Sequence, residues 1–143
     1  MNRPRPAPRN RKAGMTLLEV MIVLAIIALI AGLAAPQLME TFGRAKSRAA
    51  TIEMEGLKGA VQLFYIDTGR YPSEAEGLEA LLAAPAGVDN WQGPYLESAD
   101  SLLDPWENRY LYRSPAADKA FEIMSYGRDG RAGGTSEDSD ISI

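Results

Sequence analysis

Met15 to Ala35 read MTLLEVMIVLAIIALIAGLAA, a stretch of 21 residues in which Glu19 is the single charged side chain. A helix of about 20 apolar residues is long enough to cross the hydrocarbon core of a membrane. Five basic residues and no acidic residue precede this stretch. The sequence therefore predicts a membrane-spanning helix, with the N-terminus in the cytoplasm and the C-terminal part on the other side of the membrane.

A cleavable signal peptide is the alternative interpretation of the same stretch. The apolar region of a signal peptide is usually shorter, and it ends in an A-x-A cleavage site. No two alanines in the stretch stand two residues apart, but Gly32 and Ala34 form a looser pair of small residues with that spacing. The pattern alone leaves the signal-peptide interpretation open.

Glu19 favours a functional membrane helix. An acidic side chain at the middle of such a helix costs about 2.5 to 3.5 kcal/mol, and less near the interface. If the chain is cut between Gly14 and Met15, the new α-amino group lies one helical turn before Glu19. We therefore expect the amine of one subunit to neutralise the Glu19 carboxylate of a neighbouring subunit. A glutamate that is merely tolerated at the membrane interface is the alternative.

The composition excludes most kinds of catalytic site. The 143 residues include no Cys and no His, so disulfides, thiolate nucleophiles and imidazole ligands are absent and any bound metal must be held by oxygen. Five of the 15 basic residues lie in residues 1–14, so residues 15–143 carry 10 basic and 19 acidic side chains, a net charge of −9. This acidity argues against nucleic-acid binding. With no catalytic constellation in the sequence, we expect no enzymatic activity.

The helix is predicted to continue beyond Pro36. Apolar residues recur there mostly at intervals of three to five residues, which indicates one helical stripe that packs as core. A helix from Met15 to about Ile66 follows, with Gly32 and Pro36 as the place where it can bend or melt. Asp67-Thr68-Gly69 is a typical helix end. The stripe consists of Leu38, Phe42, Ala45, Ala49, Ile52, Leu57, Ala60, Val61 and Phe64.

The rest of the chain predicts short elements that pack on the long helix. Ser73 and Glu76 form a capping box that opens a short helix ending near Ala83. Two strands are predicted at residues 109–113 and 121–125, joined by a hairpin loop at residues 115–119. A long helix on a small antiparallel sheet is an α+β fold. The predicted organisation is a leader at residues 1–14, a membrane and assembly helix at 15–36 and a globular domain at 37–143.

The start of the chain resembles a known processing signal. Lys12-Ala13-Gly14 followed by Met15-Thr16-Leu17-Leu18-Glu19-Val20 is similar to the leader and N-terminus of type IV pilins and type II secretion pseudopilins. The resemblance implies that a prepilin peptidase cuts after Gly14 and methylates the new amine of Met15. Met15 is a departure, because the family usually has Phe at this position.

The remaining motifs resemble the major pseudopilins of type II secretion. These motifs are Arg70-Tyr71-Pro72-Ser73, Glu76-Gly77-Leu78-Glu79-Ala80-Leu81, Gly93-Pro94-Tyr95, Asp104-Pro105-Trp106 and Ser125-Tyr126-Gly127-Arg128-Asp129-Gly130. The resemblance implies a type IV pilin-like fold, a single-pass inner-membrane anchor and a periplasmic domain. It also implies polymerisation of many copies into a pseudopilus that helps to push folded exoproteins through the outer membrane, together with minor pseudopilins and an inner-membrane assembly platform. The alternatives are a minor pseudopilin, a true type IV pilin and a monomeric membrane-anchored calcium-binding module.

The C-terminal segment combines acidic residues with glycines. Asp129, Glu137, Asp138 and Asp140 lie in a stretch with three glycines after Asp129. Calcium is bound by six to eight oxygens at about 2.3 to 2.6 Å, main-chain carbonyls included. The spacing is not that of an EF-hand, and a solvated acidic tail is the alternative.

The resemblance to the major pseudopilins adds a ligand set for this segment. It implies calcium bound by Asp129, Asp138 and Asp140. Backbone carbonyls near Tyr126 and Arg131 are further candidates, and the roles of Ser136 and Glu137 stay open.

Overall fold

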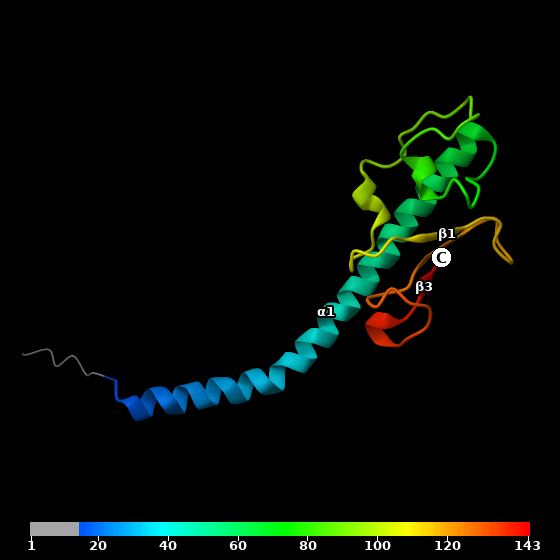
Figure 1. Cartoon of the computed structure of the whole chain (residues 1–143). Coiled ribbons are helices and arrows are strands. Elements are labelled where there is room, and N and C mark those ends of the chain that lie inside the picture. Colours follow the sequence, from blue (N-terminus) through cyan, green and yellow to red (C-terminus); the bar gives the residue numbers. More distant parts are fainter. Residues whose placement is uncertain (1–14) are drawn as a thin grey trace, which may run out of the picture. The chain divides into compact units, whose positions relative to one another are not determined.

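The structure, a computed structural model, describes residues 15–143 (Figure 1). The chain divides into two compact units, of which the second is Met39–Ile143. The predicted leader, residues 1–14, lies outside the described residues, and so does Gly14, after which cleavage is predicted. The elements in chain order are α1 (Leu17–Thr68), η1 (Leu78–Leu81), η2 (Ala99–Leu102), β1 (Leu111–Arg113), β2 (Glu122–Ser125), η3 (Ser136–Asp138) and β3 (Ile141–Ser142).

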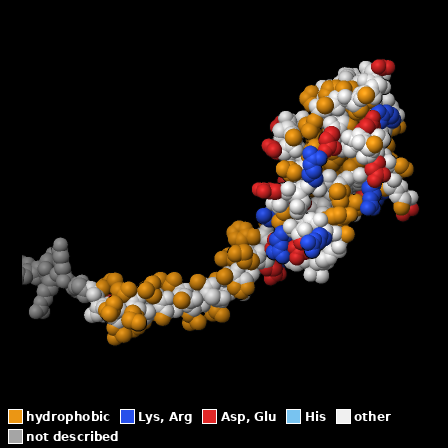
Figure 2. Space-filling view, viewed as in Figure 1, with side chains coloured by type: hydrophobic (Ala, Val, Ile, Leu, Met, Phe, Trp, Pro, Cys, Tyr) orange, Lys and Arg blue, Asp and Glu red, His pale blue; other side chains and the backbone are white. Residues whose placement is uncertain are grey.

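The first unit contains the apolar part of α1. This helix is long and apolar enough near its N-terminus to cross a membrane, and none of the side chains in its most apolar window is buried. Figure 2 shows hydrophobic side chains all along this part of the helix. The helix assignment continues through Gly32 and Pro36. The backbone therefore does not melt at the position where the sequence allowed it.

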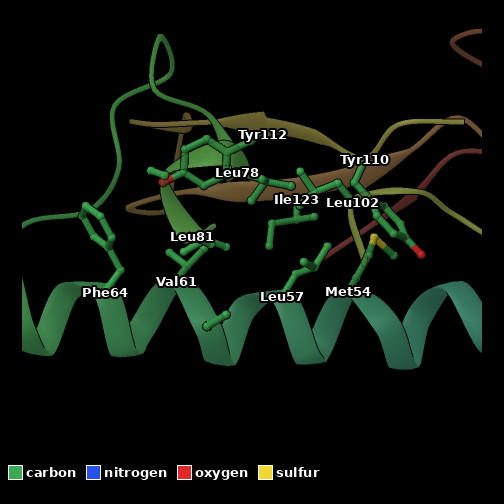
Figure 3. Close-up of a cluster of buried hydrophobic side chains, with 12 residues drawn as sticks. Met54, Leu57, Val61, Phe64, Leu78, Leu81, Leu102, Tyr110, Tyr112 and Ile123 are labelled. Atoms are coloured by element: carbon green, nitrogen blue, oxygen red, sulfur yellow. The ribbon is translucent and has the colours of Figure 1, made fainter. Parts of the chain in front are cut away.

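The second unit is built around one face of α1. Met54, Leu57, Val61 and Phe64 point from the helix into a cluster of side chains from the shorter elements (Figure 3). The helix supplies this face because its buried positions repeat at intervals of three and four residues. The other members of the cluster are Ala60, Leu78, Ala80, Leu81, Leu102, Tyr110, Tyr112 and Ile123.

The prediction that the whole apolar stripe after Pro36 packs as core is wrong for its first half. The later residues of the stripe, from Leu57 to Phe64, are buried as predicted. Phe42 and Ile52, however, are 65% and 73% exposed. Ile52 lies between the buried positions Ala50 and Met54 in sequence, about 200° around the helix from each. Leu38 and Ala45 are also exposed, and Ala49 is half-buried.

The three strands form one antiparallel sheet in the order β1-β2-β3. Leu111 pairs with Met124, and Ser125 pairs with Ile141. The predicted α+β fold is thereby confirmed. The first strand begins later than predicted, because Arg109 pairs with Leu103 in an isolated bridge instead.

The capping box is confirmed, and the short helix predicted after it is a 3-10 helix that ends at Leu81, before the predicted end near Ala83. The Ser73 N–H donates to Glu76 Oε2 at 2.7 Å, and the Glu76 N–H donates to Ser73 Oγ at 3.3 Å. Gly77 then has a φ of 61°, which an α-helix does not allow. The chain therefore continues as the 3-10 helix η1 and does not reach Ala83 as a helix.

Candidate functional site

The first candidate site lies at the N-terminus of α1. The Glu19 N–H donates to Thr16 Oγ1 at 3.2 Å, so Thr16 caps the helix. Glu19 lies in the first turn, where a carboxylate interacts favourably with the helix dipole. Both Met15 and Glu19 are exposed. Cleavage after Gly14 would convert the Met15 nitrogen from a peptide nitrogen into a free amine one turn from this carboxylate.

The Glu19 carboxylate has no cationic partner within the described part of the chain. The salt bridges among residues 15–143 involve other acids, the first of them Glu40 with Arg44 at 2.8 Å. A lone carboxylate on an otherwise apolar helix surface is costly in lipid. This arrangement leaves Glu19 available to a group on another chain.

The second candidate site is the C-terminal loop, residues 127–140, and the buried carboxylate of Asp104 anchors it. Asp104 Oδ1 accepts hydrogen bonds from the N–H groups of Trp106 and Asn108 at 3.0 and 2.9 Å. Asp104 Oδ2 accepts a hydrogen bond from Ser125 Oγ, which is fully buried. Both carboxylate oxygens are therefore engaged inside the domain, which gives Asp104 a positioning role. Asp104 belongs to one of the motifs on which the family resemblance rests, but nothing in the sequence indicated its burial.

Gly127 carries this network into the C-terminal loop. Its N–H donates to Ser125 Oγ at 3.0 Å, and its carbonyl accepts from Asn108 Nδ2 at 2.8 Å. Its φ is 68°, and a Cβ at this position would lie 2.4 Å from the carbonyl oxygen of Glu137. Only glycine fits this backbone and this close approach. The two ends of the loop are therefore held together at Gly127.

Each of the three predicted metal ligands has its own partner in this loop. Asp138 makes a two-pronged ion pair with Arg128, at 2.9 Å to Nε and 3.0 Å to Nη2. Both Asp140 oxygens accept from the N–H of Gly133 at 3.0 Å. Asp129 Oδ1 accepts from the N–H of Arg131 at 3.1 Å.

The loop contains oxygen ligands of the kind that calcium prefers, but its acidic side chains do not converge on one point. Within residues 15–143, no three acidic side chains cluster closely enough to hold a metal ion. Carboxylate and main-chain oxygens are the ligands that calcium prefers. Asp138 would have to exchange Arg128 for the metal. The ion pair was not apparent from the sequence, because Arg128 and Asp138 are ten residues apart and meet only when the loop closes at Gly127.

A groove in the second unit lacks the side chains of a usual catalytic centre. It measures about 460 Å³ and lies beside α1 at Gly56 and Leu57. Its polar lining consists of Glu53, Asp100 and two serines. These groups provide neither an activated nucleophile nor a positioned base of the usual kinds.

Two family comparisons cover almost the whole chain. The family described as "Type II secretion system (T2SS), protein G" matches residues 37–143. The family described as "Prokaryotic N-terminal methylation motif" matches residues 9–35. The second match includes Gly14, after which cleavage is predicted, and Glu19, whose carboxylate forms no salt bridge within the described residues.

Individual relatives agree with this assignment. The chain is 38% identical over 137 residues to the "Type II secretion system core protein G" of Xanthomonas campestris, covering 96% of this chain and 93% of that protein. It is 36% identical over 137 residues to the protein of the same description from Pseudomonas aeruginosa, covering 93% of this chain and 95% of the relative.

A solved structure shows the same fold. The crystal structure of the major pseudopilin from the type 2 secretion system of enterohaemorrhagic Escherichia coli superposes with a TM-score of 0.63 and 25% identity. The match covers 75% of this chain and 93% of that chain. Sequence relatives and structure thus agree, and the chain belongs to the type II secretion system protein G family.

Proposed function

We propose that this chain is the major pseudopilin subunit of a type II secretion system. Many copies polymerise into a periplasmic pseudopilus that helps to drive folded exoproteins through the outer membrane. The observation that carries the proposal is a combination of two family matches. The protein G family matches residues 37–143, and the methylation motif matches residues 9–35, which include the apolar part of α1 that no other described part of the chain buries. The protein acts as a structural subunit and not as an enzyme.

Processing prepares the subunit for assembly. A prepilin peptidase cuts after Gly14 and methylates the amine of Met15. The positive charge of this amine then compensates the Glu19 carboxylate of a neighbouring subunit in the filament. The methylation motif over residues 9–35 and the lack of an intrachain salt bridge to Glu19 within the described residues support this step.

The apolar segment also sets the location and partners of the subunit. The chain is anchored once in the inner membrane before assembly, and its second unit lies in the periplasm. Basic residues in the leader and the uncovered apolar helix support this orientation. Minor pseudopilins and the inner-membrane assembly platform are the expected partners, in addition to other copies of the chain.

Substitution of Glu19 tests the assembly role. Glu19→Ala should abolish filaments sheared from cells that produce the full chain, while the amount of membrane-bound subunit stays unchanged. Glu40→Ala is the matched control, since Glu40 is an exposed acid on the same helix, and it should assemble normally. Normal filaments from Glu19→Ala would contradict the role of this carboxylate and favour a monomeric membrane-anchored module.

We further propose that the C-terminal loop binds calcium through Asp129, Asp138 and Asp140, with main-chain carbonyls completing the shell. Three observations support this site. The candidate ligands in the loop are carboxylate and carbonyl oxygens, and the backbone approaches itself closely at Gly127 and Gly134. The small domain also has no Cys and therefore no disulfide that could stabilise it. The metal would supply charge neutralisation and a crosslink between the two sides of the loop. Asp138 would release Arg128 when it binds the metal.

Titration of calcium chloride into the fragment of residues 39–143 tests this site. Calcium should raise the melting temperature, and a chelator should reverse the increase. Asp138→Ala and Asp140→Ala should lose the response, whereas Asp118→Ala, an exposed acid in the hairpin loop, should keep it. A fragment that is indifferent to calcium and chelator would rule the site out and leave the polymerisation proposal intact.

A further inference from the structure

The side chain of Arg128 pairs with acids of the loop in which calcium binding is proposed. Its guanidinium donates to the two Asp138 oxygens, at 2.9 Å from Nε and 3.0 Å from Nη2. Its remaining nitrogen, Nη1, lies 3.9 Å from Glu137 Oε2. Glu137 and Asp138 are consecutive residues of η3. One cation therefore compensates two neighbouring carboxylates.

The backbone holds Arg128 beside these two acids. The Arg128 N–H donates to the Glu137 carbonyl oxygen at 2.8 Å. Gly127, the preceding residue, passes so close to the same carbonyl oxygen that a side chain there would collide with it. The guanidinium therefore starts within reach of Asp138, and its planar fork matches both carboxylate oxygens. Two-pronged pairs of this kind are stronger than single contacts between exposed charges.

Arg128 also distinguishes Asp138 from the other two predicted ligands. Asp138 is paired with the guanidinium, whereas Asp129 and Asp140 accept hydrogen bonds from main-chain N–H groups. Among these donors the guanidinium alone is charged. A carboxylate can keep a neutral N–H donor and still offer lone pairs to a metal. Asp138, in contrast, would have to bind the metal next to a positive charge, which repels a divalent cation.

We propose that the Arg128 guanidinium competes with calcium for Asp138 and thereby lowers the affinity of the loop for this metal. In the metal-free loop, Arg128 compensates the charges of Glu137 and Asp138, which would otherwise repel each other. The same ion pair has to break before Asp138 can serve as a ligand. The inference rests on the proposed calcium site and names the residue that sets its affinity.

Calorimetric titration of calcium chloride into the full chain in detergent measures this competition. Arg128→Gln keeps a polar side chain without the charge, and it should bind calcium about fivefold more tightly than wild type. Arg128→Lys keeps the charge without the fork, so its affinity should lie between the two. Arg109→Gln is the matched control, because it removes an exposed arginine and its ion pair with Glu79 outside the loop. Its affinity should stay within about twofold of the wild-type value.

Thermal unfolding separates competition from a merely structural role. Both tryptophans of the chain, Trp91 and Trp106, lie in the second unit, so their fluorescence follows the unfolding of this unit in the full chain. With a chelator present, Arg128→Gln should melt at a lower temperature than wild type, since Glu137 and Asp138 have lost their counter-ion. With saturating calcium this difference should disappear, because the ion pair is then broken in the wild type as well.

The outcomes distinguish this inference from the proposed calcium site. Equal calcium affinities of wild type and Arg128→Gln, or weaker binding by Arg128→Gln, would overturn the inference and leave the calcium site intact. An equal decrease in melting temperature with chelator and with calcium would show a merely structural role and would overturn it too. If neither wild type nor Arg128→Gln binds calcium, the proposed calcium site fails and the competition fails with it.

Discussion

Asn108 Nδ2 donates a 2.8 Å hydrogen bond to the carbonyl oxygen of Gly127, which joins a turn in the domain core to the start of the C-terminal loop. The N–H of the same Asn108 donates to the buried carboxylate of Asp104. Asp104 and Asn108 therefore link the backbone of the loop at Gly127 to the domain core. Changes in the core at Asp104 should reach the loop in which calcium binding is proposed.

Asp104→Ala should destabilise the second unit strongly. The substitution leaves the N–H groups of Trp106 and Asn108 and the hydroxyl of Ser125 without their acceptor. We expect a loss of about 2 to 4 kcal/mol in the free energy of unfolding, measured by urea denaturation of residues 39–143. Asp100→Ala, at an exposed acid of η2, should change stability by less than about 0.5 kcal/mol. Equal effects of the two substitutions would contradict the buried network.

Gly127→Ala should destabilise the second unit more than Gly87→Ala. Both glycines have a positive φ, 68° and 76°, so alanine is strained at each. A Cβ at Gly87 meets nothing within 4 Å, whereas one at Gly127 lies 2.4 Å from the Glu137 carbonyl oxygen. We expect an additional loss of about 1 to 3 kcal/mol at Gly127 in the same urea experiment. A smaller loss at Gly127 than at Gly87 would show that the loop is not closed at this point.

The free energy of unfolding should decrease in acid, because protonation of Glu76 breaks its ion pair with Arg70. The hydrogen bonds from the Arg70 guanidinium hold the pKa of Glu76 at about 2, below its ordinary 4.5. The pair therefore stabilises the fold above pH 4.5, and this contribution is lost as the pH falls from 4.5 towards 2. Because Arg70 is 43% exposed, we expect a contribution of only about 0.5 to 1 kcal/mol.

A comparison with Glu76→Gln measures this contribution. The difference in melting temperature between wild type and Glu76→Gln should be largest at neutral pH and should shrink between pH 4.5 and 2. Glu74→Gln, at an exposed neighbouring acid, should show no such trend. A difference that stays constant with pH would mean that the ion pair does not stabilise the fold.

Removal of the apolar segment should give a soluble monomer. Residues 39–143 form a compact unit with its own core. Without Leu17 to Leu38, this unit loses the apolar helix surface through which the subunits are proposed to assemble. Sedimentation velocity should show a single species of monomer mass. A stable filament formed by residues 39–143 alone would show that the globular surfaces are sufficient for assembly.

The long elements could be predicted from the sequence because their signals are local. The end of α1 at Thr68 follows from Gly69, whose N–H bonds to the Tyr65 carbonyl at 2.8 Å with a φ of 75°. The reciprocal hydrogen bonds of Ser73 and Glu76 are equally local. The two-residue strand β3 carries no comparable local signal, since Ile141 and Ser142 form a strand by pairing with β2, which meets β3 only after the loop closes.

The error about the apolar stripe after Pro36 has a physical cause, which is that periodicity does not say what covers a helix face. Phe42 and Ile52 have the spacing of core residues, yet the domain does not cover them. The same limit applies to the C-terminal loop. The sequence identified Asp138 as a ligand candidate, but its ion pair with Arg128 depends on how the closed loop places the two side chains.

Intact-mass analysis combined with N-terminal sequencing of the membrane-bound protein tests the central claim most directly. The claim is that processing creates a new amine whose charge compensates Glu19 in the assembled subunit. The mature chain should begin at Met15 and carry one added methyl group on its α-amino nitrogen. A mature chain that retains residues 1–14, or one that begins beyond Ala35, would contradict the claim.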